Sequence, residues 1–135
     1  MKSKPERFLR LEQAFGQLRL AVERDIGRKQ AERAEMLRQQ EALEASLHQF
    51  PELHDLTMVA AMRRLAALAN RFRDAGRDIE RLRKKAVDYF LKAKRAGELA
   101  GKLRRDAEAR RARDDLGELA GRAARDMDSS LRQEK

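Results

Sequence analysis

Few residues of this chain have the types and spacing that catalysis or metal binding requires. The two histidines, His48 and His54, are six residues apart in a predicted loop, and the chain has no cysteine. No converging set of carboxylates accompanies them, which disfavours a metal site. Asp114 and Asp115 are adjacent on a predicted helix with no pocket around them, and the later glycines are dispersed rather than grouped in a phosphate-binding loop. We therefore expect no catalytic residue, no metal and no cofactor, so the chain is not expected to be an enzyme.

Composition and periodicity point instead to long helices. Of the 135 residues, 41% are charged and 4% are aromatic, which is typical of coiled coils. In the second half, apolar residues recur seven apart, with a second row three residues further on. The first row is Met58, Leu65, Phe72, Ile79, Ala86, Ala93, Ala100 and Ala107, and the second is Ala61, Leu68, Ala75, Leu82, Tyr89, Ala96 and Leu103. These rows are the a and d positions of a coiled coil.

The partner of this helix is predicted to be the first half of the same chain. There, Phe8, Phe15 and Val22 begin a row of period seven, flanked at first by Leu11 and Leu18 three residues on. Later in the row, the flanking residues are four residues on: Ile26, Gln40 and Leu47. An antiparallel pairing in which paired residue numbers add up to about 108–111 would set the phenylalanines of helix one opposite the alanines of helix two, which keeps the packed volume even.

The predicted fold is all-α, with two long helices forming an antiparallel coiled-coil hairpin. We predict one coiled-coil domain over residues 1–135, with helix one at about 6–49, a loop at about 50–57 around Pro51, and helix two at about 58–132. The second helix is longer and overhangs the first, so residues from about 102 to 133 have no partner in the hairpin. They still carry an amphipathic stripe, phase-shifted from the earlier rows: Ala109, Ala112, Leu116, Leu119, Ala123 and Met127.

Charge is distributed unevenly along the chain. Residues 1–57 contain 10 basic and 10 acidic residues, so the net charge of +9 comes from helix two. The basic excess of helix two lies in residues 63–113, which contain 18 basic and 7 acidic residues. A basic face of this kind is often only solvated surface, but it also suits an acidic protein, nucleic acid or an acidic membrane. Nucleic acid is the less favoured partner, because no recognition module is present and most aromatic residues lie on the predicted helix interface. A homo-oligomer formed through the overhanging stripe remains a third, structural alternative.

No transmembrane segment or signal peptide is expected, since no run of about 18 apolar residues occurs and the N-terminal stretch is amphipathic. This predicts a soluble, cytoplasmic protein.

Five features of the chain occur together: the Met1-Lys2-Ser3 opening, the charged heptad helix from Phe8, the hairpin break, the longer second helix and the Arg/Glu-rich stretch over residues 108–120. In these features the chain resembles the FliJ family of flagellar export proteins. Length and architecture are also similar to YscO-type stalk proteins of injectisomes, so the choice between the two export systems stays open. The resemblance implies a central stalk seated in a hexameric export ATPase and reaching towards the export gate, possible escort of export chaperones, and a peripheral position at the inner membrane face.

Carried onto this sequence, the resemblance implies two contact regions. The ATPase-facing residues would be Arg7, Arg10, Lys102, Arg104, Arg105, Arg110, Arg111, Arg113, Leu116, Leu119 and Met127. The tip that faces the export gate would contain Phe50, Leu53 and Leu56. These three residues could equally pack over the end of the helix interface.

Overall fold

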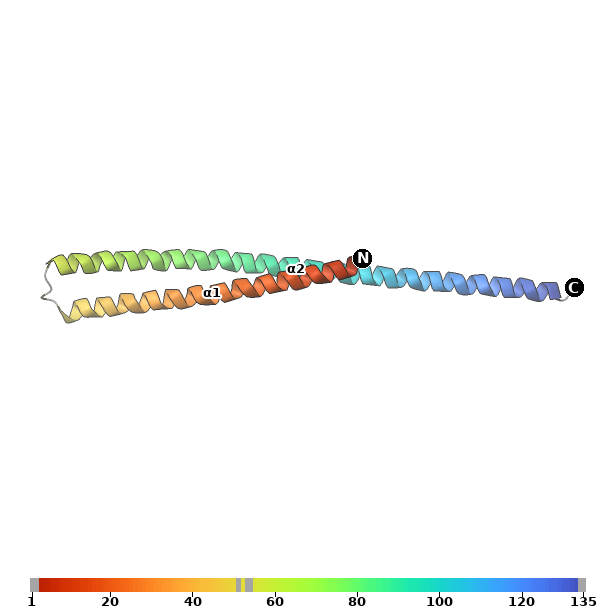
Figure 1. Cartoon of the computed structure of the whole chain (residues 1–135), viewed down its shortest axis with the longest axis horizontal. Coiled ribbons are helices and arrows are strands. Elements are labelled where there is room, and N and C mark those ends of the chain that lie inside the picture. The colour runs from red at the N-terminus through yellow and green to blue at the C-terminus, as the bar shows by residue number, and fades with distance from the viewer. Residues whose placement is uncertain (1–2, 51, 53–54, 134–135) are drawn as a thin grey trace. The chain divides into compact units, whose positions relative to one another are not determined.

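The computed structural model describes residues 3–50, 52 and 55–133, and these residues form two helices and no strand. Helix α1 is Lys4–Gln49 and helix α2 is Asp55–Gln133 (Figure 1). The helices pack against each other as an antiparallel hairpin, which confirms the predicted all-α fold. α1 begins two residues before the predicted start, and α2 begins at Asp55 rather than Met58.

Local sequence explains where α1 begins and ends. The Ser3 hydroxyl accepts a hydrogen bond from the Glu6 N–H at 3.4 Å, and the Ser3 carbonyl accepts one from the Arg7 N–H at 3.1 Å. Ser3 is therefore the N-cap, and the Glu6 carboxylate adds favourable negative charge in the first turn. At the other end, the Phe50 N–H donates to the Ser46 carbonyl at 3.2 Å. Pro51, on which the predicted break depends, lies outside the described residues.

The chain divides into two compact units. Unit 1 consists of Met1–Gln13 and Lys94–Lys135, and it contains the first turns of α1 and the C-terminal part of α2. Unit 2 is Ala14–Ala93, which contains the remainder of both helices and their connection. Each unit has its own α1–α2 interface.

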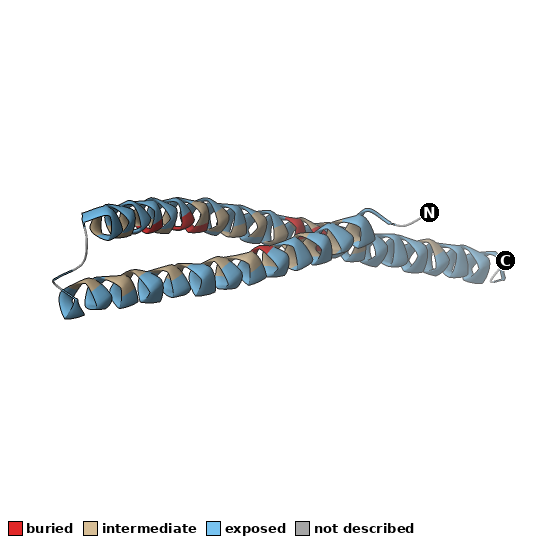
Figure 2. Ribbon diagram, turned by 60° about the vertical axis from the view of Figure 1, so that its left-hand side comes forward, coloured by how far each residue is buried: buried red, intermediate tan, exposed pale blue. Residues whose placement is uncertain are grey.

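On α2, the apolar rows predicted by the heptad pattern are the ones that face α1. In unit 2, Leu68, Ala75 and Ile79 are at most 5% exposed, and in unit 1 the same holds for Ala96 and Ala100. Every other member of the two rows from Met58 to Ala107 is partly buried. Figure 2 shows the buried positions in red, most of them on α2, with Val22 as the buried residue of α1. The hairpin is thus held by a narrow apolar strip rather than by a wide core.

On α1, the second interface row differs from the one predicted near the N-terminus. Leu11 and Leu18, three residues after the phenylalanines, are 45% and 44% exposed. The partly buried positions lie four residues on instead: Glu12, Arg19, Ile26, Arg33, Gln40 and Leu47. The positions three residues and four residues after each member of the row are about 100° apart around the helix. One straight helix can therefore direct only one of these two sets of side chains towards α2. The line that carries Ile26 and Leu47 prevails throughout.

This register places charged side chains of α1 against α2, where glycines leave room for two of them. A Cβ added to Gly97 would lie 3.0 Å from the Glu12 carboxylate in unit 1, and one added to Gly76 would lie 3.1 Å from Arg33 Nη2 in unit 2. The residue numbers of each pair add up to 109, within the predicted range. The Arg33 guanidinium also covers the Phe72 ring, with Cζ 4.0 Å from its centroid, and its buried Nε has no hydrogen-bond partner.

Aromatic rings in unit 2 are covered by cations in the same way. The Arg19 guanidinium lies 4.9 Å from the centroid of the Phe90 ring. The rings of Phe15 and Tyr89 stack with centroids 6.2 Å apart, and the Lys92 ammonium lies 5.9 Å and 6.0 Å from their centroids. The predicted register set Phe15 opposite Ala93 and Ala96, and the ring contact that the structure shows is with Tyr89, one turn before Ala93. The narrow interface does not bury these rings fully, and the cations cover part of the ring surface that would otherwise contact water.

Ile79→Ala tests how much the apolar strip contributes to stability. Ile79 is 3% exposed, so removing its outer carbons should lower the free energy of unfolding by about 2–4 kcal/mol. Leu116→Ala is the matched control because Leu116 is 65% exposed, and it should change stability by less than about 0.5 kcal/mol. Urea unfolding followed by circular dichroism measures both. Equal losses would contradict the assignment of the interface.

Two glycine substitutions test the contact between Glu12 and Gly97. A Cβ at Gly27 meets no atom within 4 Å, so Gly27→Ala should stabilise the chain by about 0.5–1 kcal/mol through helix propensity. Gly97→Ala should gain less because the Glu12 carboxylate must move. In a Glu12→Ala background, Gly97→Ala should regain the full increment. Thermal unfolding of the four variants would contradict this contact if the background made no difference.

Candidate functional site

The residues considered for chemistry do not form a site in the described part of the chain. His48, Asp114 and Asp115 are exposed on the helices, and His54 lies outside the described residues. No group of three or more histidines, cysteines, aspartates or glutamates that could hold a metal ion occurs among residues 3–50, 52 and 55–133. The features with functional potential are therefore surfaces that lack a covering element.

The first such surface is the C-terminal arm, which we define as residues 108–133 of α2. Within unit 1, every arm residue is exposed except Gly121. Gly121 is partly covered by the arm itself, since the Arg125 Nε donates to the Gly121 carbonyl at 3.3 Å. α1 begins at Lys4, which lies opposite Leu103 and Asp106. These two residues precede the arm, so no residue of α1 covers the arm. The arm is thus a single helix with solvent around it.

The apolar stripe of the arm faces away from the side of α2 that packs on α1. α2 continues without interruption through the predicted phase shift near Ala107. At about 100° per residue, Leu116 lies about 160° around the helix from Ala100 and about 140° from Leu103. Leu116, Leu119 and Met127 are 65%, 59% and 68% exposed. A partner of this stripe would approach from the side opposite α1.

Cations surround the beginning of the arm. Lys102, Arg104, Arg105, Arg110, Arg111 and Arg113 are all exposed, as are Arg7 and Arg10 on α1. Arg7 and Lys102 line the same groove, so the structure brings together two residues that are 95 positions apart in the sequence. Arg10 does not line this groove.

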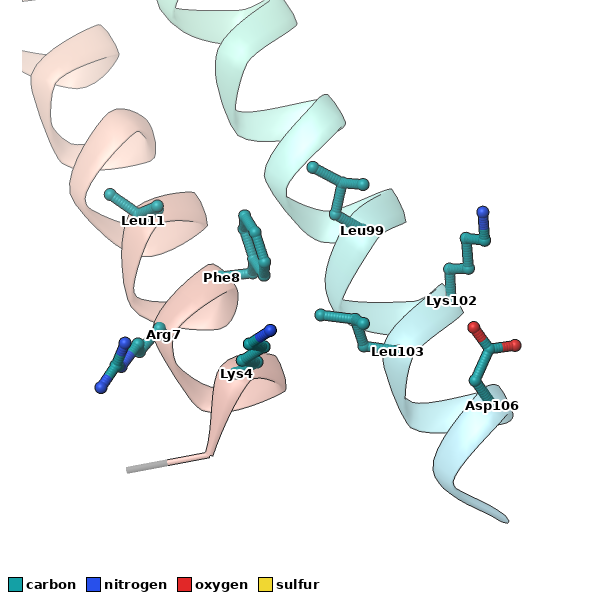
Figure 3. Close-up of a pocket in the computed structure, with 8 residues that line it drawn as sticks. All are labelled: Lys4, Arg7, Phe8, Leu11, Leu99, Lys102, Leu103 and Asp106. Carbon is teal, nitrogen blue, oxygen red and sulfur yellow. The ribbon is translucent and has the colours of Figure 1, made fainter. Parts of the chain in front are cut away.

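That groove lies in unit 1, between the first turns of α1 and residues 99–106 of α2. Phe8 and Leu11 from α1 and Leu99 and Leu103 from α2 provide apolar walls, as Figure 3 shows. The edges carry four charged side chains: Lys4, Arg7, Lys102 and Asp106. Leu11 and Leu99 were not among the residues proposed from the sequence. Leu11 could not have been singled out, because its exposure follows from the register of α1.

The hairpin tip in unit 2 is a second apolar surface. Phe50 is 60% exposed and Leu56 is 74% exposed, whereas Leu53 lies outside the described residues. Neither Phe50 nor Leu56 is buried over the end of the interface. Val59 and Met62, which the sequence analysis did not single out, are 48% and 57% exposed. Val59 follows Leu56 by three residues and Met62 follows Val59 by three, and this spacing is the signal that could have identified the surface.

Comparison with known proteins adds no assignment, since no family model, curated protein or solved structure matches this chain. A search of the described residues for helices long and apolar enough to span a membrane finds none.

Hydrogen exchange can test whether the arm is uncovered in solution. A helix without packing partners opens locally far more often than one held in an interface. Amides of residues 112–130 should therefore exchange at least about tenfold faster than those of residues 65–79, as measured by mass spectrometry at several protein concentrations. Protection of the arm that rises with concentration would contradict an uncovered arm and would show self-association.

Proposed function

We propose that this chain is a non-enzymatic stalk of a type III protein export apparatus, similar in role to the FliJ family. In this proposal, the C-terminal arm binds the hexameric export ATPase, and the hairpin extends towards the export gate. The observation that carries the proposal is the arm, an uncovered helix with an apolar stripe that includes Leu116, Leu119 and Met127. An exposed stripe of this kind, next to a hairpin that satisfies its own apolar rows, is typical of a helix that docks onto another protein.

The charges at the start of the arm support an acidic binding surface on the ATPase. Arg104, Arg105, Arg110 and Arg111 are exposed on either side of the point where α2 leaves α1. Cations at the rim of an interface chiefly raise the association rate and select the partner, whereas the apolar stripe supplies most of the affinity. The arm offers both kinds of contact within a few turns of one helix.

The exposed tip supports a second contact at the other end of the hairpin. Phe50, Val59 and Met62 present apolar atoms to solvent in unit 2, beside Leu56. Under this proposal, the tip faces the export gate, and export chaperones would also bind along the hairpin. The chain would then work in the cytoplasm and be held at the inner membrane face through the apparatus rather than by a segment of its own.

A second candidate function is binding of nucleic acid or an anionic membrane through the basic face of α2. One observation favours it: a shallow groove in unit 2 is lined by five basic residues and Glu80. The five are Arg33, Arg73, Arg77, Arg81 and Lys84. However, Arg81 pairs with Asp78 at 2.8 Å, and the Arg33 guanidinium covers the Phe72 ring, so these two cations are already engaged. The export stalk is therefore the better-supported function.

Charge reversal around the start of the arm, in a variant called the arm variant below, tests the proposal. The quadruple variant Arg104→Glu, Arg105→Glu, Arg110→Glu, Arg111→Glu should bind a type III export ATPase at least about tenfold more weakly and should no longer stimulate its hydrolysis. The matched control reverses four exposed cations in unit 2: Arg63→Glu, Arg64→Glu, Arg77→Glu and Lys84→Glu. This control should retain stimulation.

Measurements of ATP hydrolysis and of hexamer assembly by sedimentation distinguish the outcomes. If neither the rate of ATP hydrolysis nor hexamer assembly changes when the wild-type chain or the arm variant is added, the stalk proposal fails. Binding to duplex DNA or anionic vesicles that falls steeply with salt, and that both quadruple variants reduce alike, would favour the second candidate. Sedimentation of the chain alone would detect a homo-oligomer.

A further inference from the structure

The groove in unit 1 has apolar walls that an ordinary hairpin would bury. The groove has a volume of about 570 Å³, and the Phe8 ring, Leu11, Leu99 and Leu103 form its apolar walls. In Figure 3, the Phe8 and Leu103 side chains are directed into the space between the helices, and Leu11 and Leu99 lie on its two sides. A space of this size, open along one side, matches the volume of a few large apolar side chains rather than of a single water.

The groove exists because of the register that α1 adopts. Glu12 occupies the interface position opposite Gly97, so Leu11 is turned out to the edge and is 45% exposed. In a hairpin with the alternative register, Leu11 would pack on α2 and the Glu12 carboxylate would be fully solvated. Leu11 thus forms one wall of the groove.

The charges around the groove indicate which kind of molecule would fill it. Lys4, Arg7 and Lys102 are basic, and Asp106 is the single acidic residue among those that line the groove. In Figure 3, the Lys4 side chain lies between the two helices, whereas the Arg7 guanidinium points away from α2 and the Lys102 side chain lies on the outer side of α2. Cations therefore stand on both sides of an apolar strip. The N-terminus of α1 adds positive potential at the same end.

We propose that this groove binds an amphipathic helix of a partner protein that is acidic on its flanks. Apolar side chains one turn apart would enter between Leu11 and Leu99, and carboxylates on either side of them would pair with Lys4, Arg7 and Lys102. Duplex nucleic acid would satisfy the cations but leaves the apolar walls in contact with water, so charge and apolar surface together select a protein helix. This goes beyond the proposed function, because it concerns a site made by both helices and requires neither the arm nor an ATPase.

Model peptides can test the groove with the full chain. The probe is a fluorescein-labelled peptide of about 18 residues with leucines at helical spacing of three and four and glutamates elsewhere. Fluorescence anisotropy should show binding to the full chain. A peptide with lysines in place of the glutamates, and one with serines in place of the leucines, should each bind at least about tenfold more weakly.

Leu11→Asp and Leu18→Asp are a matched pair for locating the binding site. Both leucines occupy the same position of successive heptads and have the same exposure, 45% and 44%, but only Leu11 lines the groove. Leu11→Asp should weaken binding of the Leu/Glu peptide by about tenfold or more, and Leu18→Asp should leave it within about twofold. Arg7→Glu should weaken binding, whereas Arg24→Glu, on an exposed site of unit 2, should not. Circular dichroism and thermal unfolding check that all four variants fold.

Several results would overturn the proposal. Equal weakening by Leu11→Asp and Leu18→Asp, or unchanged affinity of the serine peptide, would show attraction by charge alone. Self-association that Leu11→Asp abolishes would identify a second copy of this chain as the occupant. Binding to anionic vesicles that depends on Leu11 would identify a lipid surface. Loss of ATPase stimulation by the arm variant has no bearing on these readouts, so failure of the stalk proposal and failure of this one can be told apart.

Discussion

Burial of a two-residue-wide apolar strip of α2 against α1 is the interaction on which both units of this protein depend. With 41% of residues charged, the chain has little other apolar material to bury. Small side chains such as Ala75, Ala96 and Ala100 form much of the strip on α2, so the backbones can approach closely and the larger residues of α1 fill the remaining space. Hydrogen bonds within each helix add little selectivity, because they form equally well in any helical arrangement.

The charged residues inside this interface set its register. Glu12 lies opposite Gly97, and Arg33 lies opposite Gly76 and over Phe72. Displacing either helix by one position would press a carboxylate or a guanidinium against a larger side chain, at the cost of desolvating the charge. Such contacts contribute less to stability than apolar ones would, but they discriminate between alternative alignments of two repetitive helices. The exposed Leu11, and with it the groove in unit 1, is a direct consequence of this choice.

The candidate functional surfaces are places where apolar side chains of the described residues lie exposed. The arm carries its apolar stripe on the side opposite the α1-facing rows, so no simple continuation of α1 along α2 would cover it. The tip exposes Phe50, Val59 and Met62, and the groove exposes Leu11 between cations. The exposed apolar atoms of these surfaces, beside hairpin rows that are buried, are consistent with a chain whose surfaces serve protein partners.

The heptad spacing of the sequence was sufficient to determine the two helices, their antiparallel pairing and the α2 rows, because periodicity of apolar residues directly encodes which helix face is buried. It also revealed the unpartnered stripe around Leu116. The tertiary structure alone decided which side chains of α1 face α2: those three residues after the heptad row, such as Leu11, or those four residues after it, such as Glu12. Leu11 and Glu12 are neighbours in sequence, and only the glycine opposite Glu12 makes room for the charged side chain. The groove that Arg7 and Lys102 line follows the predicted pairing of the helices, but its apolar walls depend on the exposure of Leu11, which the spacing of residues does not express. Local pattern determines which face of a helix is apolar, whereas the exact alignment of two such faces depends on the shape and charge of the residues that meet there.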